Sequence, residues 1–266
     1  MLTFPQLSTG ALTQYPLRKR LTQRTVLNVT EDGHAIALAD TGADTVYWDL
    51  SFTALTDAEV SALVTFFQSC EGSLQPFIFV DPSANLMIYS EDFSQPVWQR
   101  NTLVTLETQI ADPFGTNRAS RLTNTSAGTL TLTQTIPMPG TLNCAFSLYL
   151  RQIQTTTFTL SRTDGSTVRS LDVDPSSVWG RYALSSLFAS SVSTSNDFTI
   201  SLPAGASLEV FGPQVDAQPA AGLYVPNFGA SAVYSNCRLA TDNLVITATG
   251  PGESSVRVGI QSQANQ

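Results

Sequence analysis

The chain is poor in charge and in the side chains that carry out most protein chemistry. Only 13% of its 266 residues are charged, one residue is a histidine, three are cysteines, and the net charge is -8. The sequence holds no His/Cys ligand pairs for a metal, and an acidic chain gains nothing from neutralising phosphates. These scarcities argue against zinc-dependent and nucleic-acid-binding functions, and the short basic run at 18–20 is typical of a solvated strand end.

Long apolar runs are also lacking. No stretch approaches the roughly 18 apolar residues that span a bilayer, and the opening MLTFPQLSTG lacks the basic and apolar regions of a secretion signal. We therefore expect no membrane insertion, no signal peptide, and a protein that stays in the cytoplasm where it is made until it is assembled. Cys70, Cys144 and Cys237 fit neither a zinc spacing nor a disulfide framework, which predicts small buried apolar residues.

The first part of the chain carries strand signals and then a helix signal. Apolar and polar residues alternate over 24–29 (RTVLNV) and 46–52 (VYWDLSF), which predicts two half-buried strands with a tight turn at Asp32-Gly33. A helix is expected over about 55–71, because Thr56 is a suitable N-cap and Glu59 completes a capping box. Its buried stripe is formed by Val60, Leu63, Phe66 and Phe67, and Gly72 ends it.

Helical periodicity is missing from about Leu86 to Tyr234. Short β-type runs recur there, separated by turn residues: TLTLTQTI, CAFSLYLR, TFTLSR, VRSLDV, RYALSS, DFTISL and SLEVFG. About 150 residues of such strands suit a double-sheet jelly roll. The strands predicted at 243–250 and 254–262 form a hairpin, which is marginal alone and needs a sheet to join.

Catalytic constellations are absent as well. There is no Gly-x-Ser-x-Gly elbow and no phosphate-binding glycine loop, and His34 is predicted to be an exposed turn residue. Glu91-Asp92 with Asp216 or Asp174 would be a carboxylate pair for glycoside hydrolysis. Adjacent residues on a strand point to opposite faces, however, so Glu91 and Asp92 do not line one cleft. We predict that the chain is not an enzyme and needs no cofactor.

Aromatic side chains offer a weaker hint of saccharide binding. Trp98 and Trp179 are candidates for stacking on sugar rings, but apolar neighbours favour core packing for both. Tyr149, Tyr182 and Tyr224 carry less information. The sequence names no glycan-binding residue.

The first 82 residues resemble the distal tail and minor tail proteins of long-tailed bacteriophages. The clearest part is the helical stretch LTDAEVSALVTFFQSCEG followed by PFIFVDP. The other residues that carry the resemblance are Phe4-Pro5, Gly10, Tyr15-Pro16, the Asp32-Gly33 turn and Trp48.

A second resemblance covers about 85–238 and is to jelly-roll, carbohydrate-binding-module-like domains of phage tail proteins and fibres. It rests on NLMIYSEDFSQPVW, DPFGTNRASRL, FSLYLR, VWGRYAL and FGPQVDAQPAAGLYVPNFG. Two departures are Pro213, where a small residue is usual, and Val225-Pro226-Asn227, where the family often has Ile-Pro-Thr. Modules of this resemblance sometimes hold a structural Ca²⁺, which prefers hard oxygen ligands, and the candidates here are Glu91 or Asp92 with Asp216. The alternative, which we adopt, is that these are ordinary turn and surface carboxylates and that no metal is bound.

Together the two resemblances imply a mainly β chain in which one domain interrupts another. Residues 1–83 plus 237–266 are expected to form a small β-sheet or barrel domain with the helix at about 55–71. Residues 84–236 are expected to be an inserted antiparallel jelly-roll β-sandwich. The C-terminal hairpin would complete the interrupted sheet.

The implied function is structural. The chain is expected in the virion, at the phage tail tip, as a homohexameric ring that links the tail tube to the tip and hub proteins. The segment 1–20 is expected to lie over a neighbouring subunit, and the jelly roll to project outward for docking or glycan contact. The alternative is a receptor-binding or adhesin protein whose jelly roll binds host surface saccharide.

Overall fold

The computed structural model describes residues 2–263, and they form two compact units. Unit 1 comprises the described residues within Met1–Ser8, Leu12–Val80 and Tyr234–Gln266, and unit 2 comprises Thr9–Ala11 and Asp81–Val233. Strands dominate both units, and the described residues hold a single α-helix. The expected fold class, mainly β with one helix and a jelly-roll sandwich, is confirmed.

Unit 1 contains a sheet in the order β1-β4-β15-β17-β3-β2, with β16 beside β17. Its strands are β1 (Leu2–Thr3), β2 (Arg18–Val29), β3 (Ala35–Leu55), β4 (Phe77–Val80), β15 (Val233–Leu239), β16 (Ile246–Gly250) and β17 (Glu253–Gln263). Strand β17 pairs antiparallel with β3 from Thr45 to Leu55 and also pairs with β15. The last strand of the chain therefore joins a sheet that the N-terminal strands begin.

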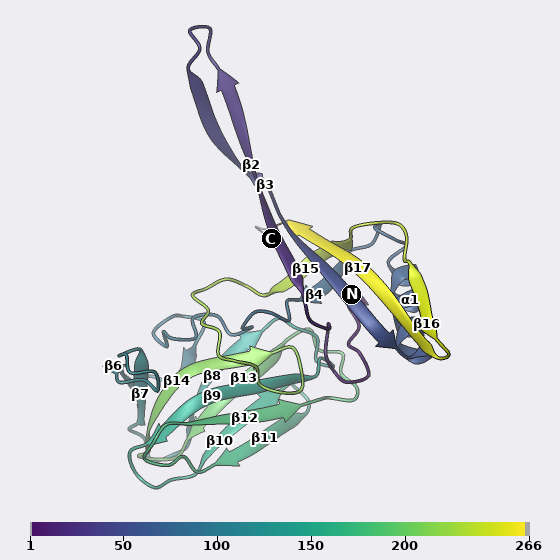
Figure 1. The fold of residues 1–266 in the computed structure, drawn as a ribbon. Helices are drawn as coiled ribbons and strands as arrows, with labels where there is room; N and C mark the ends of the chain where they lie inside the picture. Colours follow the sequence, from purple (N-terminus) through teal and green to yellow (C-terminus); the bar gives the residue numbers. More distant parts are fainter. Residues whose placement is uncertain (1, 264–266) are drawn as a thin grey trace. The chain divides into compact units, whose positions relative to one another are not determined.

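Strands β2 and β3 continue beyond this sheet as a two-stranded ribbon (Figure 1). Residues 24–29 pair with 35–40, from Arg24 opposite Asp40 to Val29 opposite Ala35. The expected pairing partner at 46–52 instead lies further along the same long strand, opposite the start of β2. The turn at Asp32-Gly33 is confirmed, and it closes the ribbon at its far end.

Helix α1 (Asp57–Ser69) begins as the sequence predicted. The Thr56 side chain accepts a hydrogen bond from the Glu59 amide, and the Glu59 carboxylate accepts from the Thr56 amide, so the capping box is present. Leu63 and Phe66 are buried. Hydrogen bonds from Ser8 and Thr56 lower the pKa of Glu59 to about 2, which suits a carboxylate at a helix N-terminus.

The start of the N-terminal segment belongs to the unit 1 core, which corrects for Phe4 and Leu12 the expectation that the segment lies over a neighbouring subunit. Strand β1 pairs with β4, and the Phe4 ring packs 5.4 Å from Phe66 and 5.7 Å from Phe79 between ring centroids. Leu12 is buried as well. The Phe4 ring therefore fills space between helix α1 and strand β4, whereas Tyr15 is 65% exposed.

Unit 2 is a sandwich of two antiparallel five-stranded sheets. One sheet has the order β11-β10-β13-β8-β5 and the other the order β12-β9-β14-β7-β6. The strands are β5 (Gln99–Arg100), β6 (Val104–Ile110), β7 (Ala119–Asn124), β8 (Leu130–Ile136), β9 (Cys144–Gln152), β10 (Phe158–Thr163), β11 (Val168–Val173), β12 (Gly180–Ser186), β13 (Asn196–Leu202) and β14 (Ser207–Asp216). Phe146 and Phe198 meet between the sheets, with ring centroids 5.5 Å apart.

The two ends of the main unit 2 segment are hydrogen-bonded to each other. The amide of Asp81, which follows β4, donates to the carbonyl oxygen of Ala232 at 2.9 Å. Ala232 directly precedes β15. The chain therefore enters and leaves this unit at adjacent backbone positions.

A buried arginine holds one part of the sandwich together. Arg162 is fully buried, and its guanidinium donates to the carbonyl oxygens of Gly140, Leu142 and Ser186 at 2.7–2.9 Å. It also donates to the Asn196 side chain and lies against the ring of Phe188. Burial lowers the pKa of Arg162, and the carbonyl oxygens supply the acceptors that a desolvated guanidinium requires.

The expected burial of the cysteines, exposure of His34 and core packing of Trp98 are confirmed. All three cysteines are buried and form no disulfide, and burial raises the pKa of the Cys70 thiol to about 11. His34 is an exposed turn residue, and Trp98 is buried against Phe93. Within residues 2–263, no helix has the length and apolar character to cross a membrane.

Candidate functional site

The candidate site is the outer face of the sheet β12-β9-β14-β7-β6 in unit 2. Strand β9 reads CAFSLYLRQ, so Phe146, Leu148 and Leu150 point into the core and are fully buried. Because strand side chains alternate, Tyr149 and Arg151 project from the opposite face. The same strand thus builds the core and presents an aromatic ring beside a cation.

A row of alternating charges crosses this face. The Glu209 carboxylate on β14 accepts from Arg121 on β7 at 2.8 Å and from Arg151 on β9. Arg121 also pairs with Glu107 on β6 at 2.9 Å. The Glu209 side chain is 5% exposed, and the side chains of Arg121 and Arg151 are about a third exposed. The buried carboxylate therefore holds the two arginines in place, while part of each arginine remains accessible to solvent.

Three aromatic side chains flank the charged row. The Arg151 guanidinium lies 4.8 Å from the centroid of Trp179, whose Nε1 donates to the Ala111 carbonyl at 3.2 Å. Phe114 is 56% exposed and its ring centroid lies 5.6 Å from that of Tyr149. Trp179 is only half-buried, which corrects its predicted core packing: it precedes β12 on the outward side and covers Arg151 instead of entering the sandwich.

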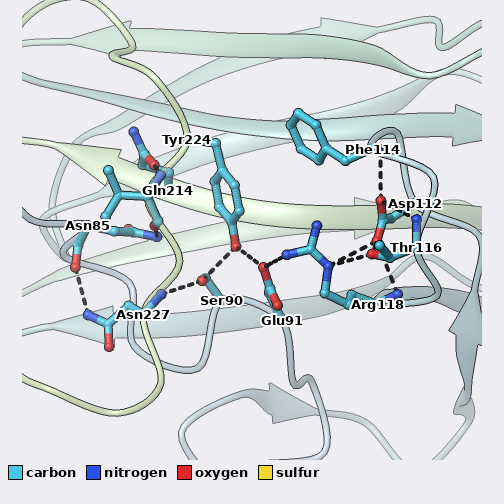
Figure 2. Close-up of polar contacts among 11 residues, drawn as sticks. Asn85, Ser90, Glu91, Asp112, Phe114, Thr116, Arg118, Gln214, Tyr224 and Asn227 are labelled. Carbon is cyan, nitrogen blue, oxygen red and sulfur yellow. Dashed lines mark hydrogen bonds and ion pairs between the residues drawn. The ribbon is translucent and has the colours of Figure 1, made fainter.

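An ion-pair network holds the loop that carries Phe114 (Figure 2). The Asp112 carboxylate accepts from the Phe114 amide at 2.8 Å, from the Thr116 hydroxyl and from Arg118 Nε at 3.0 Å. Arg118 Nη1 reaches Glu91 at 2.9 Å. Burial raises the pKa of Asp112, but the hydrogen bonds from Thr116, Phe114 and Arg118 outweigh it and lower the pKa to about 2.

Tyr224 connects this network to the segment that follows β14 (Figure 2). Its hydroxyl lies 3.1 Å from the Glu91 carboxylate and 2.9 Å from the Ser90 hydroxyl, and burial raises its pKa. Its ring packs 5.2 Å from that of Phe211. Gly212 allows this contact, since its φ is +57° and a Cβ there would come within 2.7 Å of the Tyr224 ring.

Two asparagines extend the same network to the start of unit 2. The Asn227 amide donates to Ser90 at 2.9 Å, and its side chain donates to the Asn85 carbonyl at 2.8 Å. Asn85 in turn donates to the carbonyl oxygen of Pro213 at 3.0 Å. The loops around the outer face are therefore tied to one another by buried polar groups, which favours a single arrangement of the rings.

The carboxylates proposed for calcium are held by separate sets of protein donors. Glu91 binds Arg118 and Tyr224, whereas Asp92 caps its own turn through Ser94 and Gln95. Asp216 accepts from Gln214 and the Gly222 amide, and burial raises its pKa.

This arrangement does not fit the calcium site that the resemblance implies. Between residues 2 and 263 no three His, Cys, Asp or Glu side chains gather so that they could hold a metal ion, and the Arg118 guanidinium is the cation between Glu91 and Asp112. The carboxylate pair considered and set aside for glycoside hydrolysis gains no support from these contacts: Asp174 accepts from Thr157, and Glu91–Asp92 lie in a turn and not on the strand assumed for them.

The residues that sequence reasoning missed are Phe114, Arg118, Arg121, Arg151 and Glu209. Four of them lie in stretches already singled out as landmarks, DPFGTNRASRL and FSLYLR. A usable signal existed in the second stretch, where polar residues alternate with core residues on β9. The pairing of Glu209 with two arginines has no local signal, since its partners come from other strands.

No protein-family model matches the chain, and no curated protein sequence matches it. Solved structures with a similar fold include a family 61 carbohydrate-binding module in complex with β-1,4-galactotriose, at 14% identity and a TM-score of 0.39, covering 50% of this chain and 98% of that module. A xylan-binding family 22 module of Paenibacillus barcinonensis matches at 14% identity and a TM-score of 0.41, covering 54% of this chain and all of that one. The enzymatically active domain of tailspike protein 4 of bacteriophage CBA120 matches at 13% identity and a TM-score of 0.39, covering 52% of this chain and 21% of that one.

Proposed function

We propose that the chain is a structural protein of a phage tail and that unit 2 binds saccharide on its outer sheet face. The observation that carries this proposal is the arrangement of Phe114, Tyr149 and Trp179 around the Arg151–Glu209–Arg121 row. The sequence resemblance to phage tail proteins supplies the setting in which such a face would meet a cell surface.

The chemistry of the face suits a sugar ring. A pyranose presents C–H groups on its faces and hydroxyl groups at its rim. Half-exposed aromatic rings such as Trp179 and Phe114 offer an apolar surface on which the C–H groups can pack. The charged groups of Arg151, Arg121 and Glu107 offer hydrogen bonds to the hydroxyl groups. Hydrogen bonds to charged groups are stronger than those between neutral groups.

Binding without cleavage is part of the proposal. The Glu209 side chain is 5% exposed and both of its carboxylate oxygens accept from arginines, Oε1 from Arg121 and Oε2 from Arg151, so the carboxylate is engaged within the sheet and is not presented to a glycosidic bond. Incubating the purified chain with the saccharide it binds should therefore release no new reducing ends. Release of reducing ends at enzymatic rates would overturn this part of the proposal.

The test is a saccharide-binding measurement on the full-length chain. A panel of soluble host-surface polysaccharides is titrated by calorimetry, and the best ligand is measured again with Trp179→Ala and Phe114→Ala. Each substitution should weaken binding by about tenfold, or about 1.4 kcal/mol. Phe228→Ala is the matched control, since Phe228 is an exposed aromatic of unit 2 outside the site. Equal affinity of all variants would move the site elsewhere.

A second proposed function is the ring-forming role expected for a distal tail protein. The observation that favours it is the β2–β3 ribbon, which carries large apolar side chains in solvent and so calls for a partner. The partners would be further copies of the chain, together with tail tube and tip proteins, in the virion. Light scattering and negative-stain imaging of the purified chain test this: six-fold rings support it, and trimers indicate a fibre protein instead.

Deletion of 84–235 separates the two roles. If unit 1 serves assembly, phages carrying the deletion should still form complete tails, as seen by electron microscopy. If unit 2 serves attachment, the same particles should fail to adsorb to host cells. Particles that adsorb normally would contradict the saccharide-binding role, and the absence of tails would place an assembly function in the deleted segment.

A further inference from the structure

The strongest unexplained feature is the ribbon formed by residues 24–40, named here the β2–β3 arm (Figure 1). Strand β17 pairs with β3 only from Thr45 onward, so within the described part of the chain the arm has two strands and no third. Leu27, Val29, Ile36 and Leu38 are 50–70% exposed. An isolated two-stranded hairpin is marginally stable in water, so these side chains are placed for a contact outside the chain.

The register of the arm sorts its side chains into two different faces. Leu27 stands opposite Ala37, Val29 opposite Ala35, and Thr25 opposite Ala39. Directly paired residues project on the same side, so these six form one face, the apolar face, which carries no charge. The other face has Arg24 beside Asp40, an ion pair at 3.5 Å, together with Val26–Leu38 and Asn28–Ile36.

Charges of opposite sign lie at the two ends of the ribbon. The start of β2 carries three consecutive exposed cations, Arg18, Lys19 and Arg20, and Asp49 of β3 stands opposite Arg18, so these four residues together leave the base with a net positive charge. The tip is acidic, with Glu31 and Asp32 exposed in the turn. Base and tip are about 35 Å apart at about 3.3 Å per residue, too far to neutralise each other within one chain.

These two patterns point to one occupant. We propose that the arm binds the arm of a second copy of this chain, antiparallel, with apolar face against apolar face and each acidic tip against the other copy's basic base. An antiparallel arrangement makes the contact self-complementary. Wherever a residue near the tip of one arm contacts a residue near the base of the other, the same two residues also meet with the roles of the two copies exchanged. The inference rests on the proposed assembly of copies of this chain, to which it adds a two-fold contact that does not by itself close a six-fold ring, and it does not depend on saccharide binding.

Charge reversal tests the tip-to-base contact in the full-length chain. The association constant is measured by analytical ultracentrifugation for wild type, for the tip variant Glu31→Lys/Asp32→Lys and for the base variant Arg18→Glu/Arg20→Glu. Each variant alone should associate at least about tenfold more weakly, because like charges then face each other. An equimolar mixture of the two variants should regain wild-type association, since each tip meets a base of opposite charge.

Substitutions on the two faces test which side of the arm is buried. Leu27→Thr/Val29→Thr on the apolar face should reduce association by about tenfold or more, while keeping residues that favour strands. Ile36→Thr/Leu38→Thr on the other face is the matched control and should leave association near the wild-type value. Equal effects of the two pairs would overturn the proposed face.

The outcomes also separate this inference from the assembly role itself. Wild-type rings or dimers that tolerate both charge reversals would overturn the arm contact and leave the assembly role standing. A wild-type chain that stays monomeric up to about 1 mM, a concentration at which even weak self-association is visible, would overturn both. If the arm is cut by protease in the purified chain but protected in assembled tails by contact with a different tail protein, that protein is the partner of the arm. This result would also overturn the inference.

Discussion

The hydroxyl of Tyr224 lies 3.1 Å from the carboxylate of Glu91. The two residues are far apart in the sequence, and their hydrogen bond fixes the segment after β14 to the loop that opens unit 2. Tyr224→Phe keeps the ring on Phe211 but leaves Glu91 without this donor. We expect the free energy of unfolding to fall by about 1–2 kcal/mol, measured by urea denaturation.

A matched control for this substitution is Tyr182→Phe. The hydroxyl of Tyr182 reaches its acceptor, the Asp174 carbonyl, only at 3.5 Å and in an exposed position. Its loss should change the free energy of unfolding by less than about 0.5 kcal/mol. If the free energy of unfolding falls equally in the two variants, the hydrogen bond between Tyr224 and Glu91 does not stabilise the fold more than an exposed one does.

Acid should destabilise unit 2 through Asp112. Its pKa in the folded chain is about 2, below the unfolded value of about 3.9, so the ionised carboxylate stabilises the fold above about pH 4. That stabilisation should be lost as the pH falls from about 4 to 2, because the unfolded chain takes up a proton at Asp112 over this range while the folded chain still resists it. Urea midpoints measured between pH 2 and 7 report this loss.

Asp112→Asn should lower stability at pH 7 and flatten the acid-dependent part of that curve. Asp172→Asn is the control, because Asp172 accepts from Thr159 on the other sheet and leaves the Arg118 network intact. If the Asp112 variant shows the same acid dependence as wild type, the acid sensitivity arises elsewhere in the chain.

Replacing Arg162 should be among the most damaging single substitutions in unit 2. Arg162→Met fills similar space but leaves buried carbonyl oxygens of Gly140, Leu142 and Ser186 without their donor. We expect a loss of about 3–5 kcal/mol in thermal or urea unfolding. Arg169→Met is the control, since Arg169 also lies against Phe188 but is exposed; a comparable loss there would contradict the explanation.

Iodide should quench the fluorescence of Trp179 selectively. Trp48 is fully buried and Trp98 is 4% exposed, whereas Trp179 is half-buried beside the cationic Arg151, which attracts the anion. Trp179→Phe should remove most of the quenchable signal. A bound saccharide should protect Trp179, and quenching that is unchanged at saturating saccharide would place the ligand away from this ring.

Much of the fold follows from local patterns, because each pattern reports burial on one side of an element. The Thr56–Glu59 capping box and the stripe with Leu63 and Phe66 predict the helix to within two residues at each end. The alternation in CAFSLYLR predicts β9 because one face of that strand is sealed in the core. Such signals are strong where water contacts only one side.

The same reasoning fails where both sides of a strand meet solvent. Residues 35–44 carry no clear alternation between apolar and polar positions, since neither face of the arm is buried within the chain, so the start of β3 was missed. The charged row could not be predicted from the sequence for a different reason. Nothing near Glu209 in the sequence indicates Arg121 or Arg151, and only the sheet register brings them together. Trp179 shows that apolar neighbours in sequence do not decide whether a ring faces the core.

The hydrogen bond between the Asp81 amide and the Ala232 carbonyl has a consequence for evolution. The two ends of this unit are joined by one backbone hydrogen bond. The distance that the chain must bridge between β4 and β15 is therefore short, whatever sequence lies between Asp81 and Ala232. A different module with similarly spaced ends would therefore fit the junction without disturbing β4 or β15. Recombination at this bridge is then a route by which related chains would exchange what they display while keeping unit 1 unchanged.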